Sequence, residues 1–242
     1  RIAAEGRVII AVSADNKKAA IVEVNSETDF VANDANFVGF AEAVGAAALA
    51  TQPADVAALA NVTLADGQSV EEARTALIAK IGENIQVRRL QLVDAGAGQI
   101  ATYQHGSKIG VVVCIEGGEA ETGKHIAMHI AATSPVCVDE AGVPEEVINR
   151  EREIQIDIAM QSGKPRDIAE KMVAGRMKKF LSEITLLGQP FVMNPDQTVA
   201  DLLNSKGAKV THFVRLMVGE GIEKKQENFA DEVAAQAAAA AK

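Results

Sequence analysis

One short polar stretch marks the junction from which the rest of the fold follows: Asn25-Ser26-Glu27-Thr28-Asp29-Phe30-Val31-Ala32. A β-branched run ends there and a helical pattern begins just beyond it, so the stretch predicts a strand-to-helix junction. Phe30 stands among polar neighbours, in a chain with 3% aromatic residues and no tryptophan. A phenylalanine in that setting either packs inward beside the junction or is presented to a partner.

The residues on either side of the junction predict a β-hairpin followed by a helix. Two β-branched runs, 6–12 and 18–24, flank a turn at Asp15-Asn16. Beyond the junction, apolar side chains recur at spacings of three and four over 34–50, and Asn33 is the expected N-cap of that helix. We interpret this segment as a β-β-α unit.

A second helix and a third strand are predicted next. Ser69 and Glu72 have the spacing of a capping box, which marks the start of a helix. Residues 84–93 alternate as a strand, but the alternation slips at Arg88-Arg89 and indicates a bulge. We expect these two arginines on the solvent face of the strand.

The same order of elements returns later in the chain. Residues 99–104 and 108–116 are β runs around a turn at 105–107, and a helix is expected at 120–132. A last strand at 210–218 would complete a second sheet as 84–93 completes the first. We therefore predict an α+β protein with two related subdomains, each a small antiparallel sheet with packed helices.

Residues 142–183 predict a separate antiparallel αα-hairpin. Its charged helices, 145–161 and 166–183, flank a break at 162–165. Each helix has a narrow apolar stripe, which predicts an arm that projects from the body. The expected stripe residues are Ile148, Ile154, Ile158 and Met160 on the first helix and Ile168, Met172, Met177 and Phe180 on the second. The Ala-rich residues 228–242 predict a C-terminal helix or a frayed tail.

Composition restricts the class of protein. The chain has 242 residues, 48% of them hydrophobic, with no apolar run near the ~18 residues of a membrane span, so we expect a soluble protein without membrane contact. Its formal net charge of -9 argues against direct, sequence-independent binding to nucleic acid. Two cysteines in different contexts, Cys114 and Cys137, favour a reducing cytoplasm. The start at Arg1, without a methionine or a signal pattern, predicts a fragment.

The patterns that come nearest to catalysis all fail. Residues 118–124 have the spacing of a P-loop, but His125 replaces the Ser or Thr that would hold magnesium, and Glu119 and Glu121 would repel phosphate. His125 and His129 lack a His-Glu-x-x-His motif and further ligands at suitable spacing. No Gly-x-Ser-x-Gly is present. We therefore predict no catalytic residues, no cofactor and no metal, and a protein that is not an enzyme.

Apolar side chains in polar loops are the remaining candidates. Phe30, the Phe191-Val192-Met193 group and the hairpin residue His105 share this feature, which suggests contact with a protein partner. The alternative is that Phe30 and Phe191 fold inward.

Seven motifs, in order, carry a resemblance to a known family. They are EVNSETDFV at 23–31, KIGENI at 80–85, YQHG at 103–106, HIAMH at 125–129, AMQSGKP at 159–165, QPFVM at 189–193 and VGEGIEK at 218–224. With them the sequence resembles the bacterial elongation factor Ts family over nearly its whole length. The family pattern begins with a small helical domain that this sequence lacks.

The resemblance implies a domain organisation and a function. The implied parts are an N-subdomain at 1–97, a C-subdomain at 98–141 and 184–222, the helical arm at 142–183 and a C-terminal module at 223–242. The implied function is that of a guanine-nucleotide exchange factor for the GTPase elongation factor Tu. Because some family members are host subunits of phage RNA replicases, an assembly subunit that acts through the arm is the alternative.

The family's contact positions fall on specific residues of this sequence. Its Thr-Asp-Phe-Val loop, associated with dislocating magnesium from the GTPase, falls on Thr28, Asp29, Phe30 and Val31. Other family contact positions fall on Ile81, His105, Val192 and Met193. Our hypothesis is that the Phe30 ring wedges beside the partner's nucleotide pocket while His105 and nearby residues of the C-subdomain hold a second partner domain.

Overall fold

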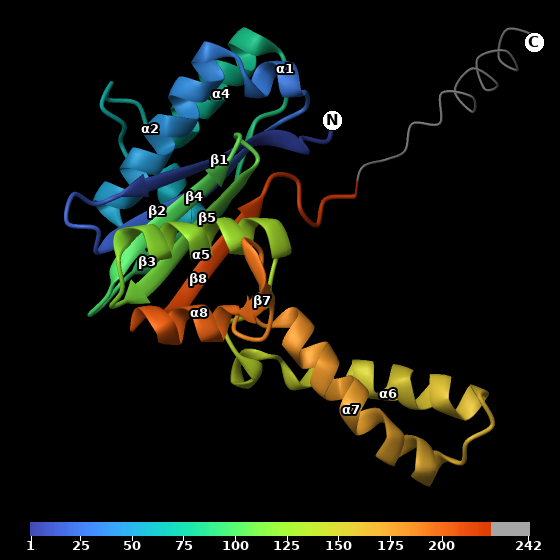
Figure 1. The fold of residues 1–242 in the computed structure, drawn as a ribbon. Coiled ribbons are helices and arrows are strands. Elements are labelled where there is room, and N and C mark those ends of the chain that lie inside the picture. The colour runs from blue at the N-terminus through green and yellow to red at the C-terminus, as the bar shows by residue number, and fades with distance from the viewer. Residues whose placement is uncertain (224–242) are drawn as a thin grey trace, which may run out of the picture.

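The structure is a computed structural model that describes residues 1–223 (Figure 1). The predicted C-terminal helix at 228–242 lies outside the described residues. The first half of the chain contains β1 (Glu5–Val12), β2 (Lys18–Ser26), α1 (Asp29–Ala32), α2 (Ala35–Thr51), α3 (Val56–Ala60), α4 (Val70–Ile81) and β3 (Gln86–Asp94). The second half contains β4 (Gln99–His105), β5 (Ile109–Glu116), α5 (Ala120–Thr133), η1 (Glu140–Gly142), α6 (Glu145–Gln161), α7 (Arg166–Ile184), β6 (Pro190–Phe191), β7 (Asn194–Thr198), α8 (Val199–Lys206) and β8 (Lys209–Met217).

The described strands form two three-stranded antiparallel sheets, in the orders β1-β2-β3 and β4-β5-β8, and the short pair β6-β7. The predicted α+β class is confirmed, and so is the role of β3 and β8 as the third strand of each sheet. The expected bulge is also present, because the pairing of β2 with β3 shifts by one residue between Glu23 and Val24.

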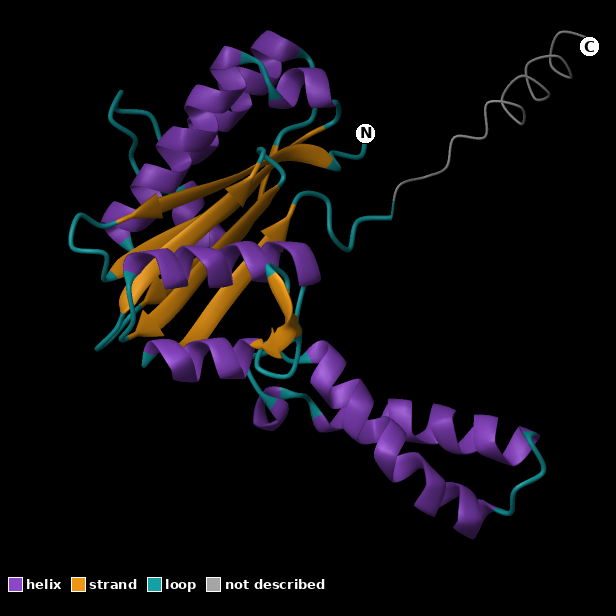
Figure 2. Ribbon diagram, viewed as in Figure 1, coloured by secondary structure: helices purple, strands orange, loops and turns teal. Residues whose placement is uncertain are grey.

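The two sheets pack face to face, which the sequence had not predicted. Alternation along β2 points Ala20 and Val22 toward the helices of the first unit, and Ile21 toward the other sheet, so the strand is buried on both faces. At Gly110 the backbone of the second sheet lies directly against side chains of the first, because a Cβ on Gly110 would lie 2.6 Å from Val8 Cγ1. Helices α2 and α4 cover one side of the strands, and α5 and α8 the other (Figure 2).

Capping explains where the first helices begin and end. The predicted capping box is confirmed, since Ser69 and Glu72 exchange side-chain and backbone hydrogen bonds at the start of α4. The expected N-cap of α2 is wrong: Asp34 accepts from the amides at its start, and Asn33 is instead the C-cap of α1. The additional four-residue helix α1 moves the cap position by one residue.

Helices α6 and α7 form the predicted antiparallel arm, which projects from the sheets (Figure 1). Its internal contact uses other residues than expected, namely Ile156, Ala159, Ala169 and Val173. The expected stripes are therefore wrong for the exposed side chains Ile154, Ile158, Met160, Ile168 and Met172, whereas Met177 is buried. Among residues 1–223, no helix is long and apolar enough to cross a membrane.

Candidate functional site

Phe30 stands on the one-turn helix α1 with its side chain in solvent. Its exposed fraction is 85%, the highest among the described large hydrophobic residues that are exposed. Thr28 is the N-cap of α1, and its hydroxyl accepts a hydrogen bond from Val31 N at 3.3 Å. Ala32 is buried at the other end of the turn. The inward alternative is therefore wrong for Phe30, and the ring is presented on a short, anchored turn.

The side-chain carboxylates of Glu83 and Glu27 hold the start of this turn. Each accepts a hydrogen bond from backbone amides in the segment that carries the other. Glu83 Oε2 accepts from the amides of Glu27 and Thr28, both at 3.1 Å, and its Oε1 accepts from Thr28 Oγ1 at 2.7 Å. In return, Glu27 Oε1 accepts from Asn84 N at 2.7 Å. We call these four hydrogen bonds the carboxylate clasp. It joins the Phe30 turn to the connection between α4 and β3.

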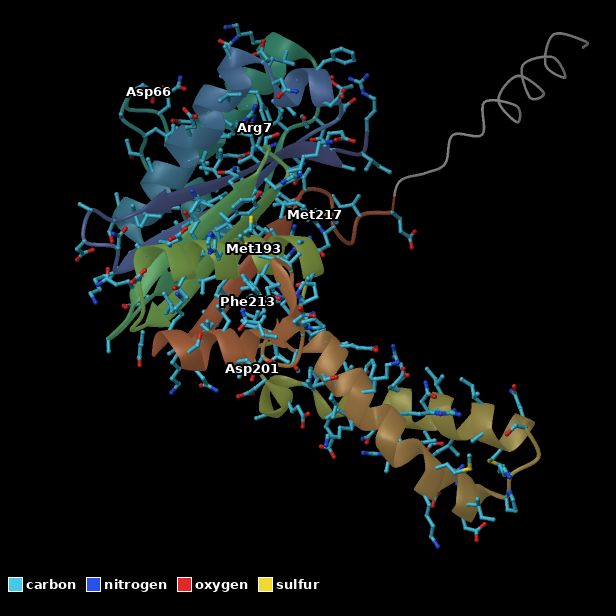
Figure 3. All side chains as sticks on the ribbon, viewed as in Figure 1. Arg7, Asp66, Met193, Asp201, Phe213 and Met217 are labelled. Carbon is cyan, nitrogen blue, oxygen red and sulfur yellow. The ribbon has the colours of Figure 1, made fainter. Side chains whose placement is uncertain are left out.

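The end of the turn is held from β1. Arg7, which extends from that strand (Figure 3), donates from Nε to Ala32 O at 2.6 Å and from Nη2 to Asn33 Oδ1 at 3.0 Å. The guanidinium thus binds a carbonyl at the C-terminus of α1, where a positive charge is favourable. Both ends of the Phe30 turn are fixed by side chains from other elements.

Ile81 belongs to the same end of the molecule. It is the last residue of α4, half-buried against the core of the first sheet, and Gly82 ends the helix with a φ of 82°. The left-handed conformation at Gly82 turns the chain directly into Glu83 of the carboxylate clasp. The structure therefore places Ile81 beside the segment that holds Thr28, Asp29, Phe30 and Val31.

His105, Val192 and Met193 come together at the second sheet. They line a cavity of about 540 Å³ together with Tyr103 and Met128, and we call this surface the apolar groove. Tyr103 OH lies 3.3 Å from His105 Nδ1. Met193 is 53% exposed and lies next to α5 in Figure 3. The structure thus separates the eight predicted positions into two surfaces, one around α1 and the end of α4 and the other beside the second sheet.

A buried histidine supports the edge of the apolar groove. His129 Nδ1 accepts from Val192 N at 3.1 Å, so Nε2 carries the proton and donates to Gln189 Oε1 at 2.9 Å. Burial lowers the pKa of His129, and its hydrogen bond with Gln189 opposes that shift. Phe191 stacks on the imidazole at a centroid distance of 5.9 Å and is only 4% exposed. The inward alternative is therefore correct for Phe191.

The expectation for Arg88 and Arg89 is wrong. Both guanidinium groups bind Glu23, a fully buried carboxylate on β2, and their side chains are only about a quarter exposed. Gly219 N also donates to Glu23 Oε1, at 2.9 Å. Burial raises the pKa of Glu23, but hydrogen bonds from Gly219, Asn25 and Arg89 outweigh it and hold that pKa below its ordinary value. Glu23 thereby ties the first sheet to the segment after β8.

Of the P-loop-like residues, 118–119 lie in the turn after β5 and 120–124 form the start of α5. Of the two histidines on α5, His125 lies 3.7 Å from Glu121 at the surface, whereas His129 is buried against Gln189. Within residues 1–223, no three potential ligands of the His, Cys, Asp and Glu types are grouped so that they could hold a metal ion.

Sequence reasoning missed the residues that support the two surfaces, namely Arg7, Glu83, His129 and Gln189. The available signal was weak. Glu83 follows the helix-ending Gly82 in a polar connection, where a carboxylate usually faces solvent. His129 stands four residues after His125, and the sequence was considered there only for a metal site.

The fold and the two surfaces define an α+β protein that exposes apolar side chains at two separate places. The chain belongs to the elongation factor Ts family: the family model described as "Elongation factor TS" matches residues 27–220. Elongation factor Ts of Thioalkalivibrio sulfidiphilus is 60% identical over 238 residues, covering 98% of this chain and 81% of the relative. That of Methylococcus capsulatus is 58% identical over 236 residues, covering 98% and 80%. That of Halorhodospira halophila is 55% identical over 236 residues, with the same coverage.

Proposed function

We propose that this chain is a translation elongation factor that acts in the cytoplasm and promotes release of GDP from the GTPase elongation factor Tu. The observation that carries the proposal is the Phe30 ring, exposed on a turn that the carboxylate clasp and Arg7 already hold. Membership of the elongation factor Ts family supplies the partner. The chain acts as an exchange factor, not as an enzyme that makes or breaks covalent bonds.

Phe30 is the group that acts on the partner's nucleotide site. Inserted beside that pocket, the ring displaces the elements that organise magnesium and the β-phosphate, with Asp29 and Val31 flanking the insertion. By linkage, the factor by which the chain lowers the GTPase's affinity for GDP equals the factor by which GDP lowers its affinity for the chain. Rebinding of nucleotide therefore ejects the exchange factor.

The apolar groove holds a second part of the partner. Its lining combines the exposed side chains of Val192 and Met193 with the imidazole of His105, which suits an apolar segment with one polar contact. Because the groove lies on the second sheet and Phe30 on the first unit, the two surfaces contact the partner at separate places. Contact at the apolar groove contributes affinity for the partner, and contact at Phe30 accelerates the release of GDP from it.

The magnitude expected from the ring follows from its burial. Complete burial of a phenylalanine side chain contributes ~1.5–3 kcal/mol, which corresponds to roughly one to two decades in rate. The full effect appears if the ring is buried only in the complex from which GDP leaves.

The test is stopped-flow release of labelled GDP from elongation factor Tu at saturating exchange factor. We expect Phe30→Ala to slow the maximal release rate by roughly one to two decades, with an unfolding free energy within about 0.5 kcal/mol of the wild type because the ring is exposed. Val136→Ala truncates another exposed apolar side chain outside both surfaces and should leave the rate unchanged. An unchanged maximal rate with Phe30→Ala rejects the proposal.

Truncation of the apolar groove should have a different kinetic signature. Met193→Ala is expected to raise the concentration of exchange factor needed for half-maximal release by about three- to tenfold, the usual cost of a contact residue. The maximal rate should stay close to that of the wild type. A lower maximal rate with unchanged half-saturation would assign the groove to release instead of affinity.

A second role for the arm has one observation in its favour. Exposed apolar side chains, among them Ile154 and Met172, occur on both α6 and α7, and the hairpin does not use them internally. Such residues suit a further protein in a larger assembly. Replacing Ile154 and Met172 by serine should then weaken that assembly and leave GDP release intact.

A further inference from the structure

We propose that Glu83 is the positioning residue for Phe30, so that the carboxylate of a distant loop sets how far the chain can accelerate GDP release. This inference rests on the proposed exchange function and adds to it a residue that does not itself reach the partner's nucleotide. Glu83 acts through the geometry of the turn that begins at Thr28.

The carboxylate of Glu83 fixes the residue from which α1 starts. Thr28 contributes its amide and its hydroxyl to Glu83, and the same hydroxyl oxygen accepts from Val31 N. One side chain therefore orients the N-cap, and the N-cap orients the first turn. Hydrogen bonds to a carboxylate are about twice as strong as neutral ones, which favours Glu83 as an anchor for the start of α1.

A four-residue helix does not hold its own direction. Nucleation of helical structure is unfavourable, and isolated helices shorter than ~12–15 residues are marginal in water. Within α1, Ala32 is buried and Val31 packs half-buried on the core of the first sheet, whereas Phe30 makes no compensating burial because it is 85% exposed. The direction of the ring therefore depends on the anchors at the two ends of the turn, Glu83 at the start and Arg7 at the end.

The support behind Glu83 is rigid. Glu83 follows α4 directly, and Leu77 of that helix is buried in the core of the first sheet. Glu27 Oε1 closes the carboxylate clasp from the opposite side through Asn84 N. Movement of the Phe30 turn away from α4 would break hydrogen bonds in both directions at once. The clasp thus orders the turn before any partner arrives, which lowers the entropy cost of binding.

The test measures maximal GDP release with Glu83→Ala and Glu83→Gln, each in the wild-type chain and in Phe30→Ala. We expect Glu83→Ala to lower the maximal rate by roughly three- to tenfold, which lies in the lower part of the range of coupling energies between interacting residues. Glu83→Gln should recover most of the rate, because its oxygen can accept from both amides while its NH2 donates to the Thr28 hydroxyl oxygen. A general loss of structure would not be repaired by that substitution.

The double-mutant cycle isolates the action through Phe30. If Glu83 only places the ring, Glu83→Ala should cause no further loss once Phe30 is alanine. Glu72→Ala is the matched control, because it removes a carboxylate that accepts from a backbone amide at the opposite end of α4. It should reduce stability without changing the maximal rate. Losses that add in the double variant overturn the proposal.

The outcomes also separate this inference from the function on which it rests. An unchanged rate with Phe30→Ala rejects the proposed function. A slowed rate with Phe30→Ala together with a wild-type rate for Glu83→Ala rejects only the positioning role. If Glu83→Ala does not fold, Thr28→Val replaces it, since it removes the hydroxyl that binds Glu83 Oε1 and should show the same non-additivity with Phe30→Ala.

Discussion

The two β-β-α units connect their second strand to their helix in opposite ways. Between β2 and α2 the chain inserts α1 and the exposed Phe30, held by side chains from other elements. Between β5 and α5 it passes through Gly117, Gly118 and Glu119, and a Cβ on Gly117 would lie 2.3 Å from Gly207 O. The β5–α5 junction is fixed by close backbone contact and has no room for an added side chain. The β2–α2 junction is held by side chains from other elements and can therefore expose the Phe30 ring.

The two units are not independent, because Glu23 links the first sheet to the segment after β8. Removing this link should have the largest effect on stability. Glu23→Ala should lower the unfolding free energy by ~3–5 kcal/mol, because it leaves the guanidinium groups of Arg88 and Arg89 without their buried partner. Urea unfolding followed by circular dichroism measures the loss. Glu71→Ala, which breaks an exposed pair with Arg74, should cost below about 1 kcal/mol. Equal small losses in both variants would show that Glu23 does not tie the units together.

The short junction makes the next largest prediction. Gly117 has a φ of 70°, and the carbonyl oxygen of Gly207 occupies the place where a Cβ on residue 117 would lie. Gly117→Ala should therefore destabilise the fold by ~1–3 kcal/mol. Gly39→Ala is the matched control: no atom outside the helix backbone lies within 4 Å of its added Cβ, and α2 should gain about 0.5–1 kcal/mol. A neutral Gly117→Ala would remove the backbone explanation for this junction.

The groups that support the two surfaces are of different types: the carboxylate of Glu83 holds the Phe30 turn, and the neutral imidazole of His129 holds the edge of the apolar groove. The dependence of stability on pH tests the second of these. Burial lowers the pKa of His129, so below the ordinary value of 6.5 the unfolded chain binds more protons than the folded one. The unfolding free energy should therefore fall as the pH drops below that value, by at most ~1.4 kcal/mol per pH unit, with no contribution from His129 well above it.

The difference between the wild type and His129→Asn isolates this effect. Asparagine can still accept from Val192 N but does not titrate in this range. Urea unfolding between about pH 5 and pH 8 should give a shallower dependence for the variant. Parallel curves for the two proteins would show that the imidazole does not carry the pH dependence.

Local patterns predicted the elements well, because the signals that make a strand, a cap or a hairpin lie within a few residues. The Ser69-Glu72 capping box and the slip in alternation at Arg88-Arg89 were both readable from the sequence. The position of Asn33 was not, because the one-turn helix before it has too few residues to show a period. Its existence depends on anchors that are distant in sequence.

Contacts between distant segments account for the remaining errors. The side chains of Arg88 and Arg89 turn inward because Glu23 is buried beside the bulge, and no pattern within β3 announces that partner. The meeting of His105 with Met193 was not readable from residue spacing, and the resemblance named the two only as separate contact positions. Glu83 looked like an ordinary surface acid, since the backbone amides that it binds lie more than fifty residues earlier.

The exposed ring of Phe30 raises the question of whether copies of the chain associate through it when no partner is bound. A single ring presents at most ~250 Å² of apolar surface, which is below the size of patches that make proteins self-associate. Its neighbours Asp29 and Asn33 are polar, and the formal charge of -9 keeps copies apart. The exposed ring of Phe30 is therefore by itself too small a surface to hold two copies of the chain together, because only a recess shaped for the ring rewards contact with it.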